Sequence, residues 1–273
     1  VSDMVKSLKD FVKNKNYLLC VDSDGCAMDT MNVKHFECFG PCFADEWQVK
    51  DRAAALKRWN EINLYRLTRG INRFKGLAMI LHEMYPNDEE VAAFKLWTDS
   101  AKELSESAVE AQIKAGGGEV YKKALAWSRA TNKTIAALSA NKKCAFNGVY
   151  EALKDAGKNF DIAIVSSANY AAVTEEWKRC SLLSLVDCVT TQQDGSKAHC
   201  ISRLIGKGYS PSNVVMVGDA PGDMDAAESN GVQFYPILVN HEEESWSRII
   251  DALNEVLNGK KLDLNGRFIA NLS

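Results

Sequence analysis

The sequence predicts an α/β fold in which a doubly wound parallel sheet is interrupted by a separate helical segment. Two observations lead to this prediction. Short apolar runs towards both ends of the chain alternate with helical patterns, which is typical of parallel strands covered on both faces. Between Thr30 and about Cys144, by contrast, the chain has helical patterns and no strand-like run.

The expected strands are short, apolar and bounded by polar or turn residues, as buried strands are. Four such runs are Tyr17–Val21, Asp161–Val165, Asn213–Val217 and Phe234–Val239, and a weaker fifth is Val186–Thr191. Continuous apolar character suits a Rossmann-like sheet, in which ligands bind at the carboxyl ends of the strands.

Helical patterns separate most of these strands. They cover Tyr150–Ala156, Ser196–Lys207 and Asp223–Ser229. The glycines that follow them are Gly157, Gly208 and Gly231. Glycine adopts the left-handed conformation that ends many helices, so each of the three is a predicted left-handed stop.

The middle of the chain is predicted to be an α-helical cap domain, residues 31–143, inserted into a core of residues 1–30 and 144–273. Its expected helices are Asp45–Leu67, Asn87–Ala115, Glu119–Arg129 and Thr134–Ala140. Asn87 and Glu90 have the spacing of a capping box. Aromatic residues recur at helical spacing and are expected in the core of the cap: Trp47, Trp59, Phe94 and Trp97.

Composition excludes several classes of protein. The 273 residues carry a net charge of -3 and lack the basic excess of a nucleic-acid-binding protein. No apolar run approaches the ~20 residues that cross a bilayer. The first residues lack the apolar centre of a secretion signal. The eight cysteines are expected to be reduced, because a chain of this length can build its own core. A cytoplasmic monomer or homodimer is therefore expected.

One group of soft ligands allows two interpretations. His35, Cys38 and Cys42 lie within the eight residues "HFECFGPC" and could hold zinc. No second cysteine pair follows at the spacing of a zinc finger. Packed or surface thiols are the favoured interpretation.

Polar residues directly follow three of the expected strands. The first strand ends in "DSDG", which contains Asp22 and Asp24, and the third ends in "GDAPGD", which contains Asp219 and Asp223. The second is followed by Ser166 and Ser167, and Lys197 opens the helix ahead of the third strand. Because the carboxyl ends of parallel strands meet at one edge, we expect these side chains to form one site.

Such a site needs positive charge. Several carboxylates in one cleft raise one another's pKa, and a hard cation such as Mg²⁺ relieves the repulsion. A hydroxyl, an ammonium and a helix N-terminus suit a phosphoryl group. Asp22 could then attack phosphorus. Ser166 is favoured over Ser167 as the hydroxyl because it follows the strand directly.

These four segments, in this order, resemble the signature of the haloacid dehalogenase-like hydrolase superfamily, and the helical segment resembles a cap placed after its first motif. The resemblance implies that Asp22 is a nucleophile that forms an aspartyl-phosphate and that Asp24 is the general acid and base. It also implies that Ser166 and Lys197 hold the phosphoryl group.

The same resemblance implies how Mg²⁺ would be bound. The side chains of Asp22 and Asp219 and the backbone carbonyl of Asp24 would be ligands, and Asp223 would support the metal, its water or Lys197. Dehalogenating members lack an acid at the position of Asp24. Cys26-Ala27 departs from the Thr-Leu or Thr-Val that often follows the glycine of the first motif.

The expected function is a Mg²⁺-dependent phosphatase, a phosphoric monoester hydrolase, acting on a small phosphorylated metabolite. A sugar phosphomutase and a non-catalytic anion-binding protein on the same fold are the alternatives. In "RLTRGINRFKGL", Arg69, Arg73 and Lys75 are candidates for binding an anionic leaving group. The other interpretation of this segment is a solvated basic turn.

Overall fold

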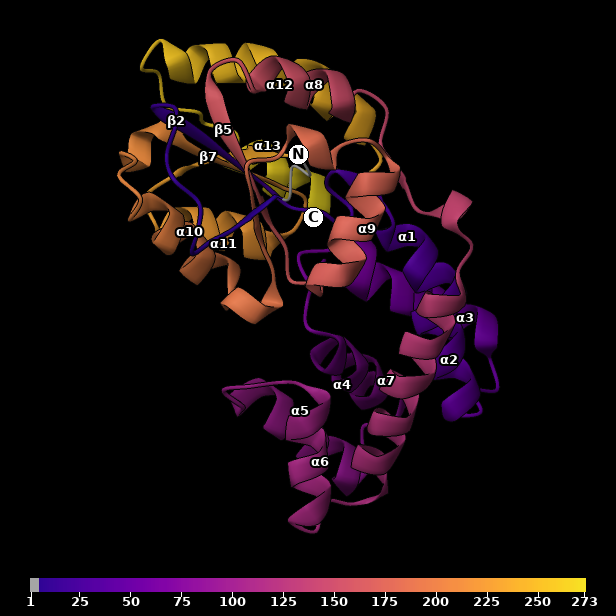
Figure 1. Cartoon of the computed structure of the whole chain (residues 1–273). Coiled ribbons are helices and arrows are strands. Elements are labelled where there is room, and N and C mark those ends of the chain that lie inside the picture. The colour runs from indigo at the N-terminus through magenta and orange to yellow at the C-terminus, as the bar shows by residue number, and fades with distance from the viewer. Residues whose placement is uncertain (1–4) are drawn as a thin grey trace. The chain divides into compact units, whose positions relative to one another are not determined.

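The computed structural model describes residues 5–273, and the chain divides into two compact units (Figure 1). One unit comprises Val1–Thr30 and Lys143–Ser273, and the other comprises Met31–Lys142. The first contains the sheet, and the second is helical. None of the helices in residues 5–273 combines the length and the apolar character needed to span a membrane.

The sheet has six parallel strands in the order β1-β6-β5-β2-β7-β8, which confirms the α/β fold class. Their bounds are β1 Lys6–Ser7, β2 Tyr17–Val21, β5 Phe160–Val165, β6 Cys188–Thr190, β7 Val214–Gly218 and β8 Gln233–Pro236. All five expected strands are present, whereas β1 was not expected. At the end of β2, Val21 is paired with Ile164 on one side and with Val217 on the other.

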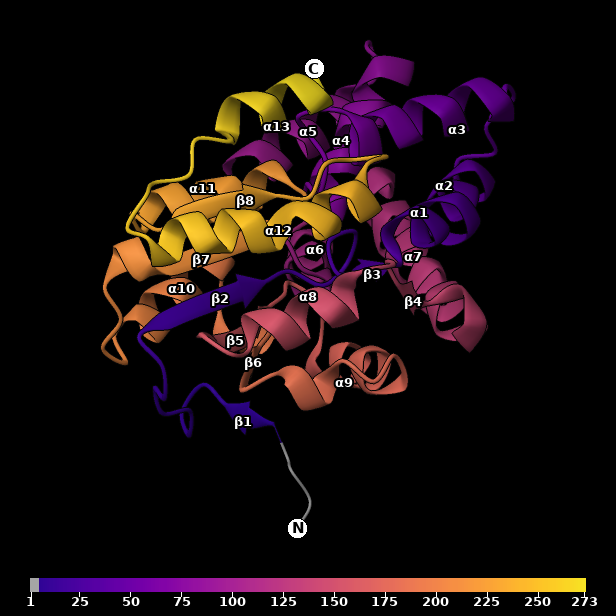
Figure 2. The ribbon, with the colours of Figure 1, turned by 90° about the horizontal axis from the view of Figure 1, so that it is seen from above.

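Helices cover both faces of the sheet. They are α8 Val149–Ala156, α9 Tyr170–Arg179, α10 Lys197–Ile205, α11 Pro221–Ser229, α12 Glu242–Leu257 and α13 Asn265–Leu272. Alternate residues of β2, Leu19 and Val21, pack in one apolar core with α8, α9 and α12. Figure 2, seen from this side, shows α8 and α12 in front of the strands, while Figure 1 shows α10 and α11 on the opposite face.

The expected left-handed stops are present at two of the three positions. Gly208 has a φ of 109° and Gly231 a φ of 65°, both in the left-handed region. The prediction for Gly157 is wrong, because its φ is -59°. Its N–H donates to the carbonyl of Leu153, so the last turn of α8 closes in the right-handed form.

Two short strands join the segments that lead into and out of the helical unit. β3 (Met28–Asp29) and β4 (Cys144–Ala145) pair in antiparallel fashion, with Met28 opposite Ala145. The N–H of Phe146 also donates to the carbonyl of Ala27 at 3.1 Å. Neither strand was expected, since two residues are too few to show a period.

The helical unit contains seven α-helices and two π-helical segments, η1 and η2. Their bounds are α1 Met31–Lys34, η1 His35–Phe39, α2 Gly40–Glu46, α3 Arg52–Asn60, η2 Glu61–Tyr65, α4 Arg73–Met84, α5 Glu89–Ser100, α6 Glu106–Lys114 and α7 Glu119–Ala137. Its core confirms the assignment of the aromatic residues. Trp59 and Phe94 are buried in it, and Trp47 and Trp97 pack against it half-buried.

The expected helices Asp45–Leu67 and Asn87–Ala115 are each broken, which corrects the prediction. The first is interrupted after α2 at Gln48, whose φ is 48°, and α3 restarts with the Asp51 side chain accepting from the N–H of Ala54. The second is interrupted between α5 and α6, where Ser105 caps the new helix. Short polar side chains compete for backbone donors in this way and start helices inside helical patterns.

The expected capping box is also wrong. Asp88, and not Asn87, caps α5 by accepting from the amides of Glu90 and Val91 at 2.9 and 3.1 Å. The Glu90 carboxylate instead accepts from the amide of Val120 at the start of α7, at 3.1 Å. Two further expected segments, Glu119–Arg129 and Thr134–Ala140, form the single helix α7, which ends at Ala137.

The possible zinc ligands have other contacts in the helical unit. His35 Nδ1 accepts a hydrogen bond from Trp59 Nε1 at 3.0 Å, Cys38 is buried, and Cys42 Sγ lies 3.6 Å from the Thr134 hydroxyl. In residues 5–273, His, Cys, Asp and Glu ligand atoms gather in threes only at Asp22, Asp219 and Asp223. These contacts favour packed thiols over a zinc site.

Candidate active site

Asp22 is the first residue after β2 and lies at the centre of the sheet edge. Its backbone N–H donates to the carbonyl of Val217 at 3.0 Å, which extends the pairing of β2 with β7 by one residue. The residue is only 5% exposed. The central position follows from the strand order, because β2 lies between β5 and β7. All three strands therefore end beside this carboxylate.

A tight turn after Asp22 carries Asp24. Gly25, with a φ of 82°, allows the chain to reverse, and the N–H of Gly25 donates to the carbonyl of Met28 at 2.8 Å. The N–H of Met28 donates in turn to the carbonyl of Ser23 at 2.8 Å. Asp24 is half-buried, and the Thr30 hydroxyl donates to its Oδ1. The turn thus presents Asp24 at the rim of the site, two residues after Asp22.

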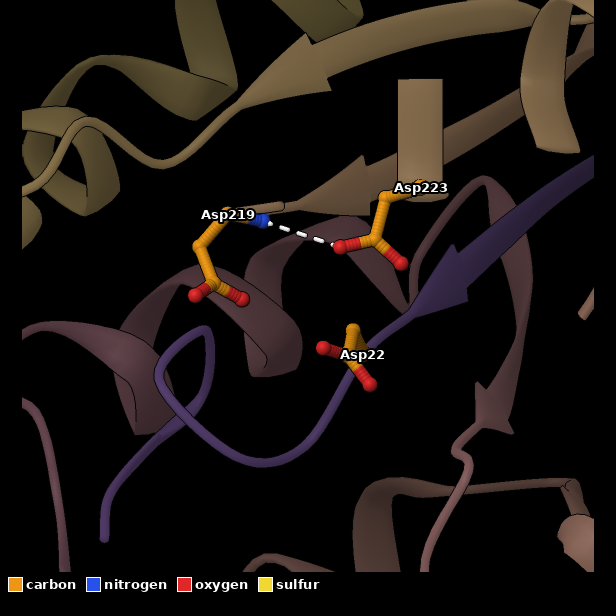
Figure 3. A group of neighbouring side chains, drawn as sticks. All are labelled: Asp22, Asp219 and Asp223. Carbon is orange, nitrogen blue, oxygen red and sulfur yellow. Dashed lines mark hydrogen bonds between the residues drawn. The ribbon is translucent and has the colours of Figure 1, made fainter. Parts of the chain in front are cut away.

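Asp219 directly follows β7, Asp223 lies in the first turn of α11, and both are buried (Figure 3). Asp223 Oδ2 accepts from the amides of Asp219 and Ala220 at 3.2 and 3.1 Å, so it caps the helix that carries it. Gly218 makes this possible. A Cβ at Gly218 would lie 2.3 Å from the Cβ of Asp223, a distance that real Cβ atoms do not tolerate.

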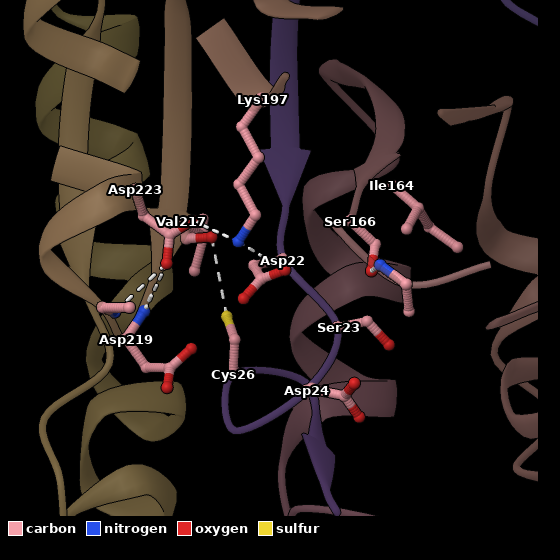
Figure 4. A network of polar contacts seen from close by, with 12 residues as sticks. Asp22, Ser23, Asp24, Cys26, Ile164, Ser166, Lys197, Val217, Asp219 and Asp223 are labelled. Atoms are coloured by element: carbon pink, nitrogen blue, oxygen red, sulfur yellow. Dashed lines mark hydrogen bonds and ion pairs between the residues drawn. The ribbon is translucent and has the colours of Figure 1, made fainter. Parts of the chain in front are cut away.

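Lys197, the first residue of α10, points its ammonium between two of these carboxylates (Figure 4). Nζ lies 2.9 Å from Asp22 Oδ1 and 2.6 Å from Asp223 Oδ1. The predicted gathering of Lys197 with the strand-end acids is therefore present in the structure. The lysine side chain is 16% exposed, so it carries its charge into the site from the rim.

Ser166 follows β5 and lies on the side of Asp22 away from Asp219 and Asp223 (Figure 4). Its N–H donates to the carbonyl of Thr190, and its Oγ accepts from the N–H of Ala168, both at 3.1 Å. The residue is 4% exposed, whereas Ser167 is exposed. The first hydroxyl after the strand is therefore the one held at the sheet edge.

The charge of the site is strongly unbalanced without a cation. Burial raises the pKa of the Asp22 carboxyl well above its usual value; Lys197 opposes this, and Asp223 and Asp219 add to it. Carboxylate oxygens of Asp22, Asp219 and Asp223 lie within 4.8 Å of one another. Three carboxylates against one ammonium leave a net charge that one divalent cation would balance. Hard oxygen ligands at this spacing fit Mg²⁺.

The carboxylate of Asp24 is not part of this group of three. Its side chain accepts a hydrogen bond from Thr30 at the rim, and the resemblance implies that its backbone carbonyl is the metal ligand. Thr30 itself was missed by the sequence analysis. A hydroxyl six residues after Asp24 carries no signal until the turn brings the two together.

The three basic candidates of the helical unit differ in their surroundings. Arg69 is 3% exposed, and its Nη1 donates to the carbonyl of Leu64 at 2.8 Å. Arg73 Nη1 donates to Asn132 Oδ1 at 2.8 Å and to Ser128 Oγ at 3.1 Å, and its guanidinium lies over the ring of Phe39. Lys75 is half-buried. Both arginines therefore have partners within their own unit, and substrate binding by any of the three stays a prediction.

The fold and the site together define an α/β enzyme core with an acidic centre at the carboxyl ends of its middle strands. The chain belongs to the haloacid dehalogenase-like hydrolases, since the model of that family matches residues 71–237. The matched segment contains Ser166, Lys197, Asp219 and Asp223, and it begins after Asp22 and Asp24. The family assignment made from the motifs is confirmed.

Solved structures with the same fold are distant in sequence. One is an inferred phosphoglycolate phosphatase from Lactobacillus delbrueckii subsp. bulgaricus, with a TM-score of 0.57, 14% identity, and coverage of 88% of this chain and 99% of that one. Another, from Haemophilus somnus, has a TM-score of 0.53, 14% identity, and coverage of 88% and 98%. A haloacid dehalogenase-like hydrolase from Streptococcus pneumoniae has a TM-score of 0.51, 12% identity, and coverage of 84% and 90%. No curated protein matches the sequence.

Proposed function

We propose that this chain is a Mg²⁺-dependent phosphatase that hydrolyses the phosphate monoester of a small metabolite, with Asp22 as the nucleophile. One observation carries the proposal. The buried Asp22 carboxylate lies 2.9 Å from the ammonium of Lys197 and within 4.8 Å of the oxygens of Asp219 and Asp223. An anionic nucleophile can approach an anionic phosphate only where positive charge offsets their repulsion.

The metal would be held by Asp22 and Asp219, by the backbone carbonyl of Asp24, and with support from Asp223. When bound, Mg²⁺ supplies positive charge that draws a phosphoryl oxygen towards Asp22 and stabilises the charge that develops on it. Ser166 and Lys197 are the protein groups proposed to hold the phosphoryl group. They would orient the remaining phosphoryl oxygens by a hydroxyl and an ammonium.

The proposed reaction has two steps. In the first, a carboxylate oxygen of Asp22 bonds to phosphorus, the bond from phosphorus to the leaving oxygen breaks, and Asp24 gives its proton to that oxygen. In the second, Asp24 takes a proton from water, whose oxygen bonds to phosphorus while the bond to Asp22 breaks. Phosphate is released, and both aspartates return to their starting states.

The same proposal assigns a separate function to each of the two units. Residues 1–30 and 144–273 would form the catalytic core, and residues 31–143 would form a cap that selects the substrate and excludes water. Two solved relatives carry phosphoglycolate phosphatase in their names, which supports a small phosphorylated substrate for this chain. The side chains of Arg69 and Arg73 are hydrogen-bonded within the helical unit, whereas that of Lys75 makes no hydrogen bond or ion pair within residues 5–273, so Lys75 is the first to test.

The proposal is tested by phosphate release from an aryl phosphate with Mg²⁺. Asp22→Asn keeps the volume of the side chain but removes the nucleophile, so turnover should fall by about 10³-fold or more in a folded protein. Asp225→Asn is the matched control, because Asp225 is exposed on the same helix as Asp223. Wild-type protein that binds phosphate without turnover would favour the anion-binding alternative. Isomerised sugar phosphate without free phosphate would favour the mutase.

A further inference from the structure

Two tryptophans hold the turn that carries Asp24. Trp177, on α9, donates from its indole Nε1 to the hydroxyl of Ser23 at 2.9 Å. Trp246, on α12, donates from its Nε1 to the carbonyl of Cys26 at 2.9 Å. All four residues are at most 1% exposed. Water therefore cannot replace either hydrogen bond without a rearrangement of the core.

The two hydrogen bonds bracket Asp24. Ser23 precedes it directly, and Cys26 follows it by two residues. The same turn is fastened on its other side to β7, because the Cys26 Sγ contacts the carbonyl of Val217 at 3.5 Å and the N–H of Asp22 donates to that same carbonyl. The backbone on both sides of Asp24 is thus fixed, while its side chain lies half-buried at the rim.

Ser23, between the two acids, is the hydrogen-bond acceptor of Trp177. A buried hydroxyl needs a hydrogen-bond partner, and a buried indole N–H needs an acceptor. Ser23 and Trp177 therefore satisfy each other in the apolar core. Trp177 also lies on the helix that follows Ser166, so one helix connects the phosphate-binding hydroxyl with the turn after the nucleophile. The contact therefore relates the positions of two motifs that are distant in the sequence.

We propose that Trp177 and Trp246 are positioning residues that keep Asp24 in place beside Asp22 by anchoring the turn at Ser23 and Cys26. The proposal rests on the proposed function, in which Asp24 protonates the leaving oxygen. Loosening of the turn should impair that proton transfer more than it impairs attack by Asp22. A poor leaving group, such as an alkyl alcohol, depends on the proton far more than a nitrophenolate does.

The test compares three single variants with the wild type. Trp177→Phe and Trp246→Phe each remove one indole donor, and Ser23→Ala removes the acceptor of Trp177 while leaving the ring in place. Tyr235→Phe is the matched control, because the Tyr235 hydroxyl is a buried donor to the carbonyl of Ser245 on α12 at 2.6 Å and lies outside the turn. Thermal unfolding of each variant sets a temperature at which all are folded.

The first measurement is kinetic. For Trp177→Phe, Trp246→Phe and Ser23→Ala, kcat/KM for an alkyl phosphate should fall at least about five-fold more than kcat/KM for p-nitrophenyl phosphate. Tyr235→Phe should lower Tm without changing that ratio. In the double variant Ser23→Ala/Trp177→Phe, the loss should equal that of the larger single variant, since the two residues form one contact. Equal losses on both substrates, or additive losses, would overturn the positioning role.

The second measurement does not depend on activity. Hydrogen exchange should quicken about ten-fold or more at the amides of Gly25 and Met28, which close the turn, in the tryptophan and serine variants but not in Tyr235→Phe. Exchange within two-fold of the wild type would contradict the anchoring. Failure of the proposed function has a different outcome, because wild-type protein would then release no phosphate from either substrate while the exchange result still decided whether the turn is anchored.

Discussion

Asp223 and Lys197 form an ion pair of 2.6 Å in which each group also has a second partner. Lys197 Nζ contacts Asp22, and the other oxygen of Asp223 accepts from the amides of Asp219 and Ala220, which directly precede α11. Burial lowers the pKa of Lys197, but the charges of Asp22 and Asp223 and their hydrogen bonds outweigh this and raise it above its usual value. The ammonium therefore stays charged and joins three segments of the site.

Replacement of Lys197 by Met should remove the ammonium and leave the buried carboxylates of Asp22 and Asp223 without their positively charged partner. We expect kcat for phosphate release to fall by about 10²–10³-fold, as for the loss of other groups that stabilise developing charge. Lys197→Arg should retain little of the activity, because a planar guanidinium does not fit where a compact ammonium lies between two carboxylate oxygens. Lys178→Met, an exposed residue on α9, is the control. Activity of Lys197→Met within ten-fold of the wild type would contradict the assigned role.

The two glycines of "GDAPGD" should respond differently to alanine. Gly218→Ala places a Cβ 2.3 Å from the Cβ of Asp223, so the helix start must shift. We expect a loss of about 1–3 kcal/mol in the free energy of unfolding and a fall in kcat. At Gly222 an added Cβ meets no atom within 4 Å, so Gly222→Ala should be neutral or stabilising by about 0.4–1 kcal/mol. Urea unfolding of both variants measures this, and equal effects would refute the packing argument.

Asp24→Asn should separate the two steps of the proposed reaction. Asparagine can still accept from the Thr30 hydroxyl, so the turn should persist, but it can neither give nor take the proton. With an aryl phosphate, whose leaving group needs little help, Asp22 should still be phosphorylated and the acyl-phosphate should accumulate. Rapid quenching and mass measurement of the intact protein detect it. Rapid turnover of Asp24→Asn with no accumulated intermediate would assign the acid and base role elsewhere.

At the amino end of β5, the buried pair of Tyr209 and Asp161 should make the stability of the protein decrease at alkaline pH. The Tyr209 hydroxyl donates to Asp161 Oδ2, which also accepts from the amides of Asn14 and Lys15 at 2.9 Å. Burial, together with the hydrogen bond to Asp161 and its charge, raises the pKa of Tyr209 above its usual value. Above pH ~10 the unfolded chain loses a proton that the folded protein keeps, so stability falls as pH rises.

Tyr209→Phe removes this contribution. Between pH ~10 and ~11, the free energy of unfolding of the wild type should therefore fall by about 1 kcal/mol more than that of the variant, because the unfolded tyrosine is already half ionised at pH ~10. Urea unfolding at a series of pH values gives both slopes. Tyr150→Phe, which alters an exposed tyrosine, should keep the slope of the wild type. Parallel slopes for wild type and Tyr209→Phe would show that Tyr209 ionises normally in the folded protein.

Much of this molecule could be read from local patterns. The apolar runs predicted five strands of the sheet, and the polar residues that follow three of them predicted the site. This succeeds because a parallel sheet brings the carboxyl ends of its strands to one edge, whatever connects them. The helical unit was predicted as a whole, but its breaks at Gln48 and before Ser105 were not. A polar cap can interrupt a helix without disturbing the apolar period around it.

The sequence by itself therefore determined the fold class, the family, the positions of Asp22, Asp24, Ser166, Asp219 and Asp223 after the strands, and that of Lys197 at the start of a helix. Only the tertiary structure decided which groups hold them. Trp177 contacts Ser23 across 154 residues, and Trp246 contacts Cys26 across 220. Periodicity reports on neighbours within one helix or strand, whereas these hydrogen bonds depend on how separate helices pack on the sheet. Burial then makes such contacts specific, because a polar group in the core must find its partner there.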